Sequence, residues 1–200
     1  MIIWINGAFG SGKTTAACEL ARRVPGARVF DPENIGYFFR RNLPPELTKP
    51  DFRSFRLWRA FNRDMLRAYA EGFSGVIICP MTLTNPAHFD EIIGELRRGG
   101  TDVRHVILSA SRETLLRRLN KRLARGDTFA KSQIDVCLQA FAADVTEGKI
   151  ETDALGDSEV AERIGEVCGI PLPPDRRSGL RRRLDRAAAQ IRVIRTIFKP

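Results

Sequence analysis

A glycine-rich segment near the amino terminus carries the residues best suited to chemistry. It follows the apolar run from Ile2 to Ile5 and reads Gly7-Ala8-Phe9-Gly10-Ser11-Gly12-Lys13-Thr14. Its glycines let the backbone take positive φ and bring several N–H groups around a polyphosphate, where a Cβ would block the approach. Lys13 can reach the β- and γ-phosphates, Thr14 can offer its hydroxyl to Mg²⁺, and the following helix adds the positive end of its dipole. An ordinary glycine-rich turn is the alternative, but a strand pattern before the segment and a helix pattern after it favour a nucleotide triphosphate site.

The same segment predicts which residues hold the ligands. We expect ATP to be bound by nine consecutive residues: Gly7, Ala8, Phe9, Gly10, Ser11, Gly12, Lys13, Thr14 and Thr15. Thr14 is the predicted Mg²⁺ ligand, and Lys13 is also a predicted catalytic residue because its charge faces the transferring phosphate. Neither histidine lies at a metal-binding spacing from the other histidine or from a cysteine, so we expect no separate structural metal site.

Phosphoryl transfer also needs a group that receives the proton of the acceptor. Asp31 is the candidate, since it ends the apolar run from Arg28 to Phe30 and the carboxyl ends of parallel strands face the ligand crevice. A helix cap before Pro32 is its alternative role. The third apolar run, Val76 to Cys79, is followed by no acid, so Asp31 has a second possible role as a metal ligand through water.

A basic helical stretch is suited to form a lid over the nucleotide. Arg118 and Arg122 are one helical turn apart and would share a face, and the segment from about 118 to 132 is the predicted lid. Closed over ATP, these two arginines would neutralise the transferring group; otherwise they form a solvated basic face. The phosphate-loop motif favours the first interpretation, so both are predicted catalytic residues.

Five apolar runs alternate with helical patterns along the chain. They lie at Ile2 to Ile5, Arg28 to Phe30, Val76 to Cys79, Val103 to Leu108 and around Ile150. Such alternation predicts an α/β fold with a P-loop-type parallel sheet of about five strands, flanked by helices.

Helix start signals sharpen this picture. Asn85-Pro86 predicts a helix that ends at Gly99, and Ser111 predicts the start of another. Ser158 is the expected cap of a helix that runs through Cys168. Many aromatic residues lie between Gly36 and Tyr69; core packing accounts for most of them, and an apolar acceptor pocket beside Asp31 is the alternative for several.

The positive charge of the chain is concentrated at its carboxyl end. The net charge is +9, yet residues 175–200 hold nine arginines and lysines against two aspartates. We expect a kinase-like domain over 1–170, a proline linker at 171–174 and a basic amphipathic helix over 175–200. The helix suits either an anionic membrane surface or packing on its own domain or on a twin subunit. A nearly neutral body argues against specific nucleic-acid binding.

Two further expectations concern the compartment. The four cysteines are far apart in the sequence and form no Cys-x-x-Cys pair, which is typical of reduced core thiols. No stretch has the length of a membrane span and no signal peptide is recognisable. These features predict a cytoplasmic protein, with peripheral contact at the inner face of the membrane as an open alternative.

Several motifs together resemble the bacterial tunicamycin resistance protein family. They are Trp4 to Thr14, Asp31-Pro32-Glu33, Leu57 to Asn62, Pro80-Met81-Thr82 and Gln133-Ile134-Asp135. The resemblance implies a nucleoside-monophosphate-kinase-like fold, ATP binding and protection against an antibiotic with a uridine-containing sugar core and a fatty acyl chain. It also implies nucleotide-binding roles for the loop and lid roles for Arg118 and Arg122, although Arg125-Gly126-Asp127 departs from the family pattern.

The leading hypothesis is therefore an ATP- and Mg²⁺-dependent phosphotransferase that modifies a hydroxyl of a nucleoside-like antibiotic. Two rivals remain open. One is an ATP-dependent protein that sequesters the drug at the membrane without turnover, and the other is a metabolic nucleotide or small-molecule kinase. Whether the chain forms a homodimer is left open by the sequence.

Overall fold

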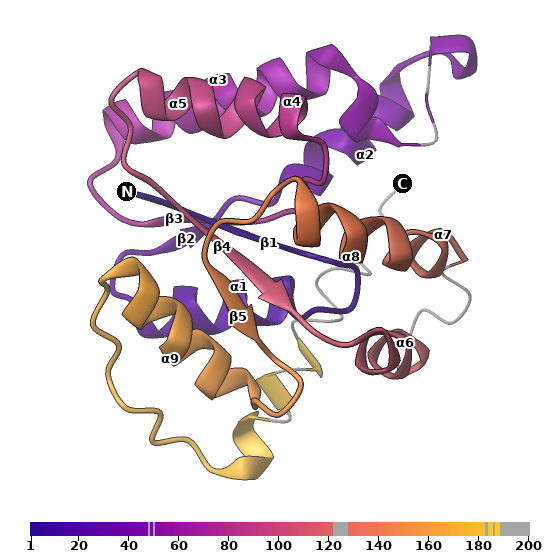
Figure 1. Cartoon of the computed structure of the whole chain (residues 1–200). Coiled ribbons are helices and arrows are strands. Elements are labelled where there is room, and N and C mark those ends of the chain that lie inside the picture. The colour runs from indigo at the N-terminus through magenta and orange to yellow at the C-terminus, as the bar shows by residue number, and fades with distance from the viewer. Residues whose placement is uncertain (48, 50, 122–127, 183, 186, 189–200) are drawn as a thin grey trace.

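The predicted alternation of strands and helices is present in a computed structural model of the chain. Its five-stranded sheet is parallel throughout and has the strand order β2-β3-β1-β4-β5 (Figure 1). The structure describes residues 1–47, 49, 51–121, 128–182, 184–185 and 187–188. The strands are β1 Ile2–Gly7, β2 Arg28–Val29, β3 Ile77–Pro80, β4 Val103–Ser109 and β5 Lys149–Glu151. The predicted fold class is confirmed.

Helices flank the sheet and connect its strands. They are α1 Lys13–Arg23, α2 Pro32–Asn42, α3 Arg56–Gly72, α4 Pro86–Phe89, α5 Glu95–Arg98, α6 Arg112–Asn120, α7 Thr128–Ser132, α8 Ile134–Ala143 and α9 Asp157–Cys168, with short helical turns η1 Pro45–Leu47, η2 Phe52–Ser54 and η3 Asp90–Gly94. The helix predicted after Asn85 is formed by α4, η3 and α5 in direct succession. Its cap is as expected, since the Asn85 side chain accepts hydrogen bonds from the amides of Ala87 and His88.

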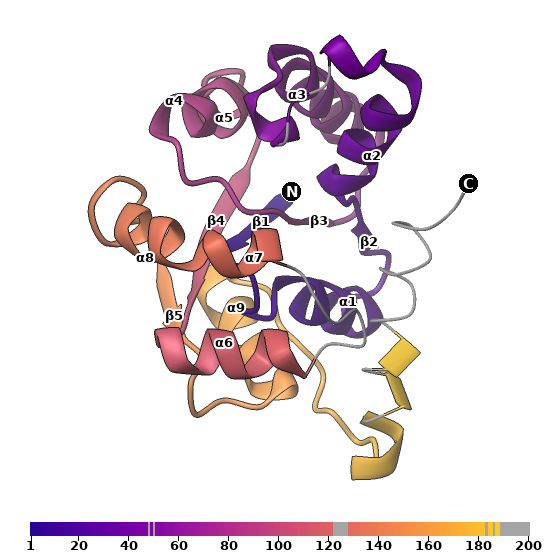
Figure 2. The same cartoon turned by 90° about the vertical axis from the view of Figure 1, so that its right-hand side faces the viewer.

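Alternate residues of β1 point to opposite faces of the sheet and divide the core in two. Ile2 and Trp4 pack under α2, α3 and the α4–α5 run. Ile3 and Ile5 pack on the other face against α1 and α9. Figures 1 and 2 show these two helical layers with the sheet between them. Because both faces are covered, the central strand is apolar at every position from Ile2 to Ile5, as a buried parallel strand requires.

The last helix of the body begins differently from the prediction. α9 starts at Asp157 with Gly156 as its cap, and the Glu159 carboxylate accepts a hydrogen bond from the Gly156 amide. Ser158 instead lies inside the first turn, where its hydroxyl donates to Glu162 and faces the Arg23 guanidinium. The prediction that Ser158 caps this helix is wrong, because the helix already starts at Asp157 and the Glu159 carboxylate bonds the amide of its cap, Gly156.

The segment after α9 is described as far as residue 188. Residues 171–178 form neither helix nor strand, and the described residues between 179 and 188 are helical. Within the described part of the chain, no helix is both long enough and apolar enough to cross a membrane. The amphipathic helix predicted over 175–200 is described only in part, because 183, 186 and 189–200 lie outside the described residues.

Candidate nucleotide and acceptor site

The glycine-rich loop connects the end of β1 to the start of α1 and lies where the strand order changes direction. β1 has β3 on one side and β4 on the other, so its carboxyl end is the point at which a parallel sheet opens a ligand crevice. Gly7, Gly10 and Gly12 have φ of 137°, 86° and 103°. A Cβ on Gly7 would lie 2.5 Å from the Leu108 carbonyl oxygen, whereas a Cβ on Gly12 would meet nothing within 4 Å. The loop is therefore packed tightly against the protein at Gly7, whereas at Gly12 it is open to a ligand.

Buried polar side chains hold this loop in place. The Asn6 side-chain carbonyl accepts from the amides of Gly7 and Leu83, each at 2.9 Å, and its amide group donates to the Leu83 carbonyl. Thr82 donates its hydroxyl to the Gly7 carbonyl at 2.8 Å. These bonds tie the loop to the chain after β3, so the backbone is ordered before a ligand arrives. Sequence reasoning gave Asn6 and Thr82 no role, because their partners are about 75 residues away.

Lys13 lies buried beneath the loop. Its ammonium group donates to the carbonyls of Gly7 and Ala8, at 2.9 Å each, and lies 5.6 Å from the centre of the Phe9 ring. The Ser11 hydroxyl is buried and, among the described residues, has no hydrogen-bond partner. A lysine, a buried hydroxyl and the amino end of α1 on one open glycine loop match the oxygen-rich surface of a polyphosphate. The residues present therefore fit Mg²⁺–ATP, with Thr14 on the first turn of α1 as the metal-facing hydroxyl.

The two ends of the glycine motif are expected to respond differently to alanine. G7A should lower the free energy of unfolding by about 2 kcal/mol, because it adds left-handed strain to a clash with backbone. G12A should destabilise less but lower nucleotide affinity at least roughly tenfold, since its methyl group enters the open side of the loop. Denaturant titration and calorimetry with an ATP analogue measure the two effects. Nucleotide binding by G12A at wild-type affinity would contradict this account of the loop.

Asp31 stands directly after β2 and before α2. Its carboxylate accepts a hydrogen bond from the Glu33 amide, so it does cap α2, as the alternative interpretation proposed. Burial, and to a smaller extent the charge of Glu33, raise the pKa of Asp31 to about 7, although the nearby Lys13 charge opposes this. A carboxyl group with a pKa near neutrality can gain and lose a proton in solution at physiological pH. Asp31 therefore lies close enough to the loop for the charge of Lys13 to act on its pKa.

Arg53 is a buried cation that sequence reasoning missed. It lies on η2, where its guanidinium bonds both carboxylate oxygens of Asp51 at 2.8 and 2.9 Å. The far side of this guanidinium reaches the Thr82 carbonyl and the Gln133 side chain, each at 3.4 Å, and lies 5.8 Å from the Phe9 ring centre. Lys13 and Arg53 therefore share the Phe9 ring. The only sequence signal was an arginine in an aromatic segment, which is too common to single out.

Arg118 lies on the opposite side of the loop, near the end of α6. It donates to the Ser11 carbonyl at 3.3 Å, to the Thr152 hydroxyl at 3.0 Å and to the Thr152 carbonyl at 2.6 Å. Burial lowers the pKa of Arg118 from its ordinary value, yet the group stays charged near neutrality. Arg122, the second predicted lid arginine, lies outside the described residues together with 123–127. The pairing of the two arginines on one face therefore stays a prediction.

A small pocket adjoins the loop on the Arg118 side. It has a volume of about 210 Å³ and is lined by loop residues, Thr15 on α1, Arg118 on α6, Lys121 directly after it, and Leu155 and Asp157 after β5. Thr15 thus lines the pocket next to the loop, as its predicted binding role requires. Within the described part of the chain, no group of three or more histidine, cysteine, aspartate or glutamate side chains could hold a metal ion. The threonine and carboxylate oxygens near the loop suit a metal that arrives with its nucleotide.

Comparison with known proteins extends these observations. Residues 2–143 match the AAA domain family. The tunicamycin resistance protein of Deinococcus radiodurans has 30% sequence identity and a TM-score of 0.73, with 86% of this chain and 98% of that chain covered. A sugar kinase from a Janibacter species (21% identity, TM-score 0.62, 84% and 94% covered) and the shikimate kinase of Bacteroides thetaiotaomicron (21%, 0.58, 85% and 99%) share the fold. No curated protein sequence matches the chain.

The fold, the glycine loop and these matches define a nucleotide-binding protein with a P-loop, kinase-like fold. The family match covers residues 2–143, and the 30% identity extends over 98% of the Deinococcus protein. The chain belongs to the AAA domain family and to the family of the tunicamycin resistance protein.

Proposed function

We propose that this protein is an ATP- and Mg²⁺-dependent phosphotransferase that acts on a hydroxyl group of a nucleoside-like small molecule, and that tunicamycin is its acceptor. The observation that carries the proposal is the open glycine loop with its buried Lys13 at the end of β1, with Asp31 at the end of β2 on the same carboxyl edge of the sheet. The Deinococcus relative, a tunicamycin resistance protein, supports the choice of drug, and the structurally similar kinases support the reaction class.

Each residue has one task in the proposed reaction. Bound Mg²⁺–ATP supplies the phosphoryl group to be transferred. Lys13 moves from the loop carbonyls to the terminal phosphates and stabilises the charge that builds up there, while Thr14 holds the metal. Asp31 receives the proton of the acceptor hydroxyl, and the predicted lid arginines, Arg118 and Arg122, neutralise charge from the other side. In its other proposed role, Asp31 would hold the metal through water, and its carboxylate would take no proton from the acceptor.

An exposed apolar patch on α3 and on α2, the helix that Asp31 caps, supports an acceptor with a lipid-like part. Phe38 on α2 is 55% exposed, and Leu57 and Phe61 on α3 are 58% and 39% exposed. Phe61 packs edge-on against Phe39 at 6.1 Å between ring centres, so the two helices present one continuous apolar surface. The aromatic segment as a whole is mostly core: Trp58 and Phe39 are buried, and several of its other rings pack against that core cluster. Core packing thus accounts for the buried members of this segment, and the exposed members suit a fatty acyl chain. An acceptor pocket beside Asp31 stays a prediction.

Mass spectrometry of the drug tests this function. The full-length protein with Mg²⁺, ATP and tunicamycin should add the mass of one phosphoryl group to the drug, and a panel of nucleosides, nucleotides and sugars should react far more slowly. Unmodified tunicamycin at full protein occupancy would defeat the proposal. Faster phosphorylation of an ordinary metabolite would instead favour a metabolic kinase.

The competing proposal of drug sequestration at a membrane is favoured by one observation. Leu180 and Leu184 lie one helical turn apart in the basic carboxyl-terminal segment and are 70% and 57% exposed. An apolar stripe beside arginines suits an anionic lipid surface. Sedimentation with anionic liposomes, with and without residues 175–200, decides whether this contact occurs. Protection against the drug that never exceeds one drug molecule per protein would support sequestration over turnover.

Arg53 offers a more specific prediction for the phosphotransferase. We expect R53A to lower kcat roughly 10- to 100-fold, because a buried cation beside Phe9 and Lys13 is placed to stabilise charge on the reacting groups. R53K, which keeps the charge but not the paired contact with Asp51, should recover part of the loss. R56A, at an exposed arginine three residues away, is the matched control and should retain full activity. Equal rates for R53A and R56A at saturating substrates would refute this role.

A further inference from the structure

The segment that follows α9 is held against the body by buried groups. The Arg23 guanidinium, 3% exposed on its side chain, bonds the Pro173 carbonyl, the Ser158 hydroxyl and the Glu162 carboxylate. Leu172 packs so closely on Gly165 of α9 that a Cβ there would lie 1.9 Å from it. The proline linker is therefore docked on α1 and α9, and the chain beyond it starts from a defined place.

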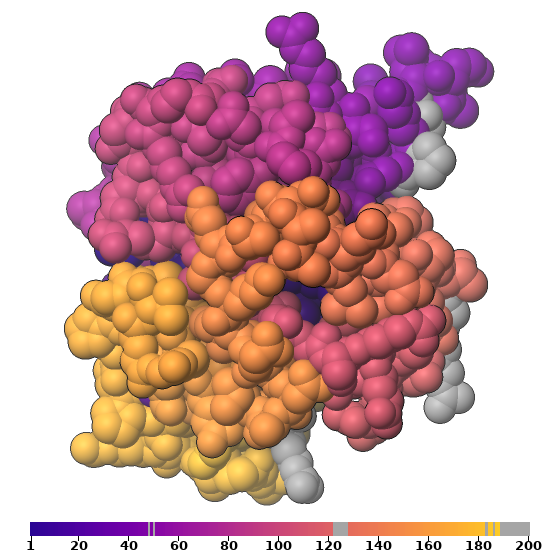
Figure 3. All heavy atoms as spheres, in the orientation of Figure 1, coloured from indigo at the N-terminus to yellow at the C-terminus, as the bar shows by residue number. Residues whose placement is uncertain are grey.

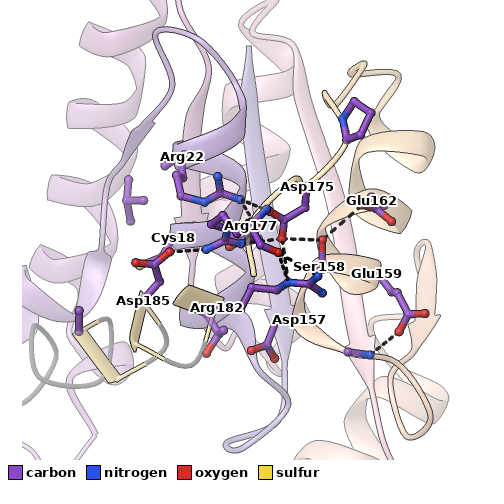
Figure 4. A pocket seen from close by; sticks show the side chains of 17 residues that line it. Cys18, Arg22, Asp157, Ser158, Glu159, Glu162, Asp175, Arg177, Arg182 and Asp185 are labelled. Carbon is purple, nitrogen blue, oxygen red and sulfur yellow. Dashed lines mark hydrogen bonds and ion pairs between the residues drawn. The ribbon is translucent and has the colours of Figure 1, made fainter. Parts of the chain in front are cut away.

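Arg177 then fastens the following segment to α1. Its guanidinium pairs with Asp175 at 2.9 Å, with Asp185 at 2.5 Å and with Glu19 on α1 (Figure 4). These carboxylates raise the pKa of Arg177, and Arg177 in turn holds the pKa of Asp175 well below its usual range. Asp175 and Glu19 have side chains only 4% and 10% exposed, so these pairs are less screened than surface pairs. We name this group of Glu19, Asp175, Arg177 and Asp185 the tail clamp.

The tail clamp closes one side of a large cavity. The cavity has a volume of about 900 Å³ and lies between α1, the first turn of α9 and the described residues from Pro174 to Ala188. Figure 4 shows Cys18 and Arg22 of α1, Asp157 and Ser158 of α9, and Arg182 around it. In the space-filling view of Figure 3, the yellow carboxyl-terminal segment lies on the α9 side of the molecule, opposite the purple and magenta helices.

This cavity adjoins the pocket beside the glycine loop. Thr15 and Asp157 line both spaces. Sites for small ligands usually measure about 300–1,000 Å³, so the 210 Å³ beside the loop is too small for a whole nucleotide. When the phosphates lie on the loop, the nucleoside part of the nucleotide must extend past Thr15. The larger cavity lies in that direction.

We propose that the carboxyl-terminal segment, through the tail clamp, is a wall of the nucleotide site and that its cavity takes the nucleoside half of the bound nucleotide. This inference rests on the nucleotide site of the proposed function. The lining chemistry gives the orientation. The cavity wall holds six carboxylates against three arginines, so its net charge is negative and repels phosphate. A lining carboxylate such as that of Asp157 can accept hydrogen bonds from ribose hydroxyls and base amino groups. The acidic cavity and the glycine loop thus select opposite ends of one molecule.

Two ligands distinguish the loss of this wall from a general effect of a substitution on the fold. Calorimetry on the full-length protein compares a non-hydrolysable Mg²⁺–ATP analogue with Mg²⁺–tripolyphosphate, which has the phosphates but no nucleoside. R177A and D185N should weaken binding of the ATP analogue roughly tenfold and leave tripolyphosphate binding unchanged. D185N loses only one contact of the tail clamp, so it remains informative if R177A is poorly folded. R163A, on an exposed pair of α9 with both side chains 62% exposed, is the control and should match the wild type.

The outcomes are distinguishable. Unchanged affinity of both clamp variants for the ATP analogue overturns the wall, and so does an equal loss of affinity for both ligands. Neither of these results touches the phosphate site, because the wild type would still bind tripolyphosphate. A wild-type protein that binds neither ligand overturns the proposed function and this inference together.

Discussion

Replacement of Lys13 by alanine is expected to lower kcat/KM for phosphoryl transfer roughly 10³-fold. Lys13 is the buried cation that the glycine loop holds by two hydrogen bonds of 2.9 Å, and in the proposed reaction it moves to the terminal phosphates. The loss arises because no other side chain on the loop carries a positive charge. Steady-state rates with tunicamycin and ATP measure it.

Two controls isolate this effect. K149A removes an exposed lysine at the sheet edge and should leave the rate unchanged. The free energy of unfolding of K13A should stay near that of the wild type, because the Gly7 carbonyl keeps its hydrogen bond from Thr82. A folded K13A with more than a tenth of the wild-type rate would show that phosphoryl transfer does not use this lysine.

Replacement of Asp31 by asparagine is expected to lower kcat roughly 10²- to 10⁴-fold while leaving the fold intact. Asparagine also caps helices well, so the bond from the Glu33 amide is retained and only the proton acceptor is lost. The wild-type rate should rise with pH through about 7, where Asp31 becomes a carboxylate, and the D31N residual rate should lack this rise. A wild-type rate that is independent of pH between 5 and 8 would favour the metal-ligand role instead.

The neighbouring carboxylate and the stability of the fold give two checks on Asp31. E33Q removes a charge that raises the pKa of Asp31, so its rate profile should move to lower pH. Because the folded-state pKa of Asp31 lies above its unfolded value, the native state binds more protons between pH 4 and pH 7. Its contribution to stability is present below pH 4 and is lost as pH rises through about 7. D31N should therefore gain stability relative to the wild type as pH rises over this window, which denaturant titrations would detect.

The sequence predicted those features that depend on local pattern. Continuous apolar runs identified the buried parallel strands, and the spacing of Gly7, Gly12 and Lys13 identified the phosphate loop, because both patterns reflect short-range backbone requirements. Asp31 was found for the same reason: a residue just after a strand lies at the carboxyl edge of the sheet. Its near-neutral pKa could not be predicted, since burial depends on what packs around it.

Features formed by segments that are far apart along the chain could not be predicted from the sequence. Arg53 meets Phe9 and Gln133 only after three separate segments pack together, and the tail clamp joins Glu19 to a residue 158 positions away. The amphipathic pattern of the carboxyl-terminal segment predicted a helix but left its contact surface open. The error at Ser158 has a local cause, because Gly156 and Glu159 form a competing cap that composition alone does not favour.

The central claim, turnover of the drug by phosphoryl transfer, is tested most directly by counting phosphates moved from labelled ATP. Purified full-length protein is incubated with excess tunicamycin, Mg²⁺ and ATP labelled in its γ-phosphate, and the label in each product is measured. The account predicts that label accumulates in the drug to many molecules per molecule of protein, and that K13A and D31N abolish this accumulation. Label that remains in ATP or is released as free phosphate, while the drug stays unmodified, would contradict it.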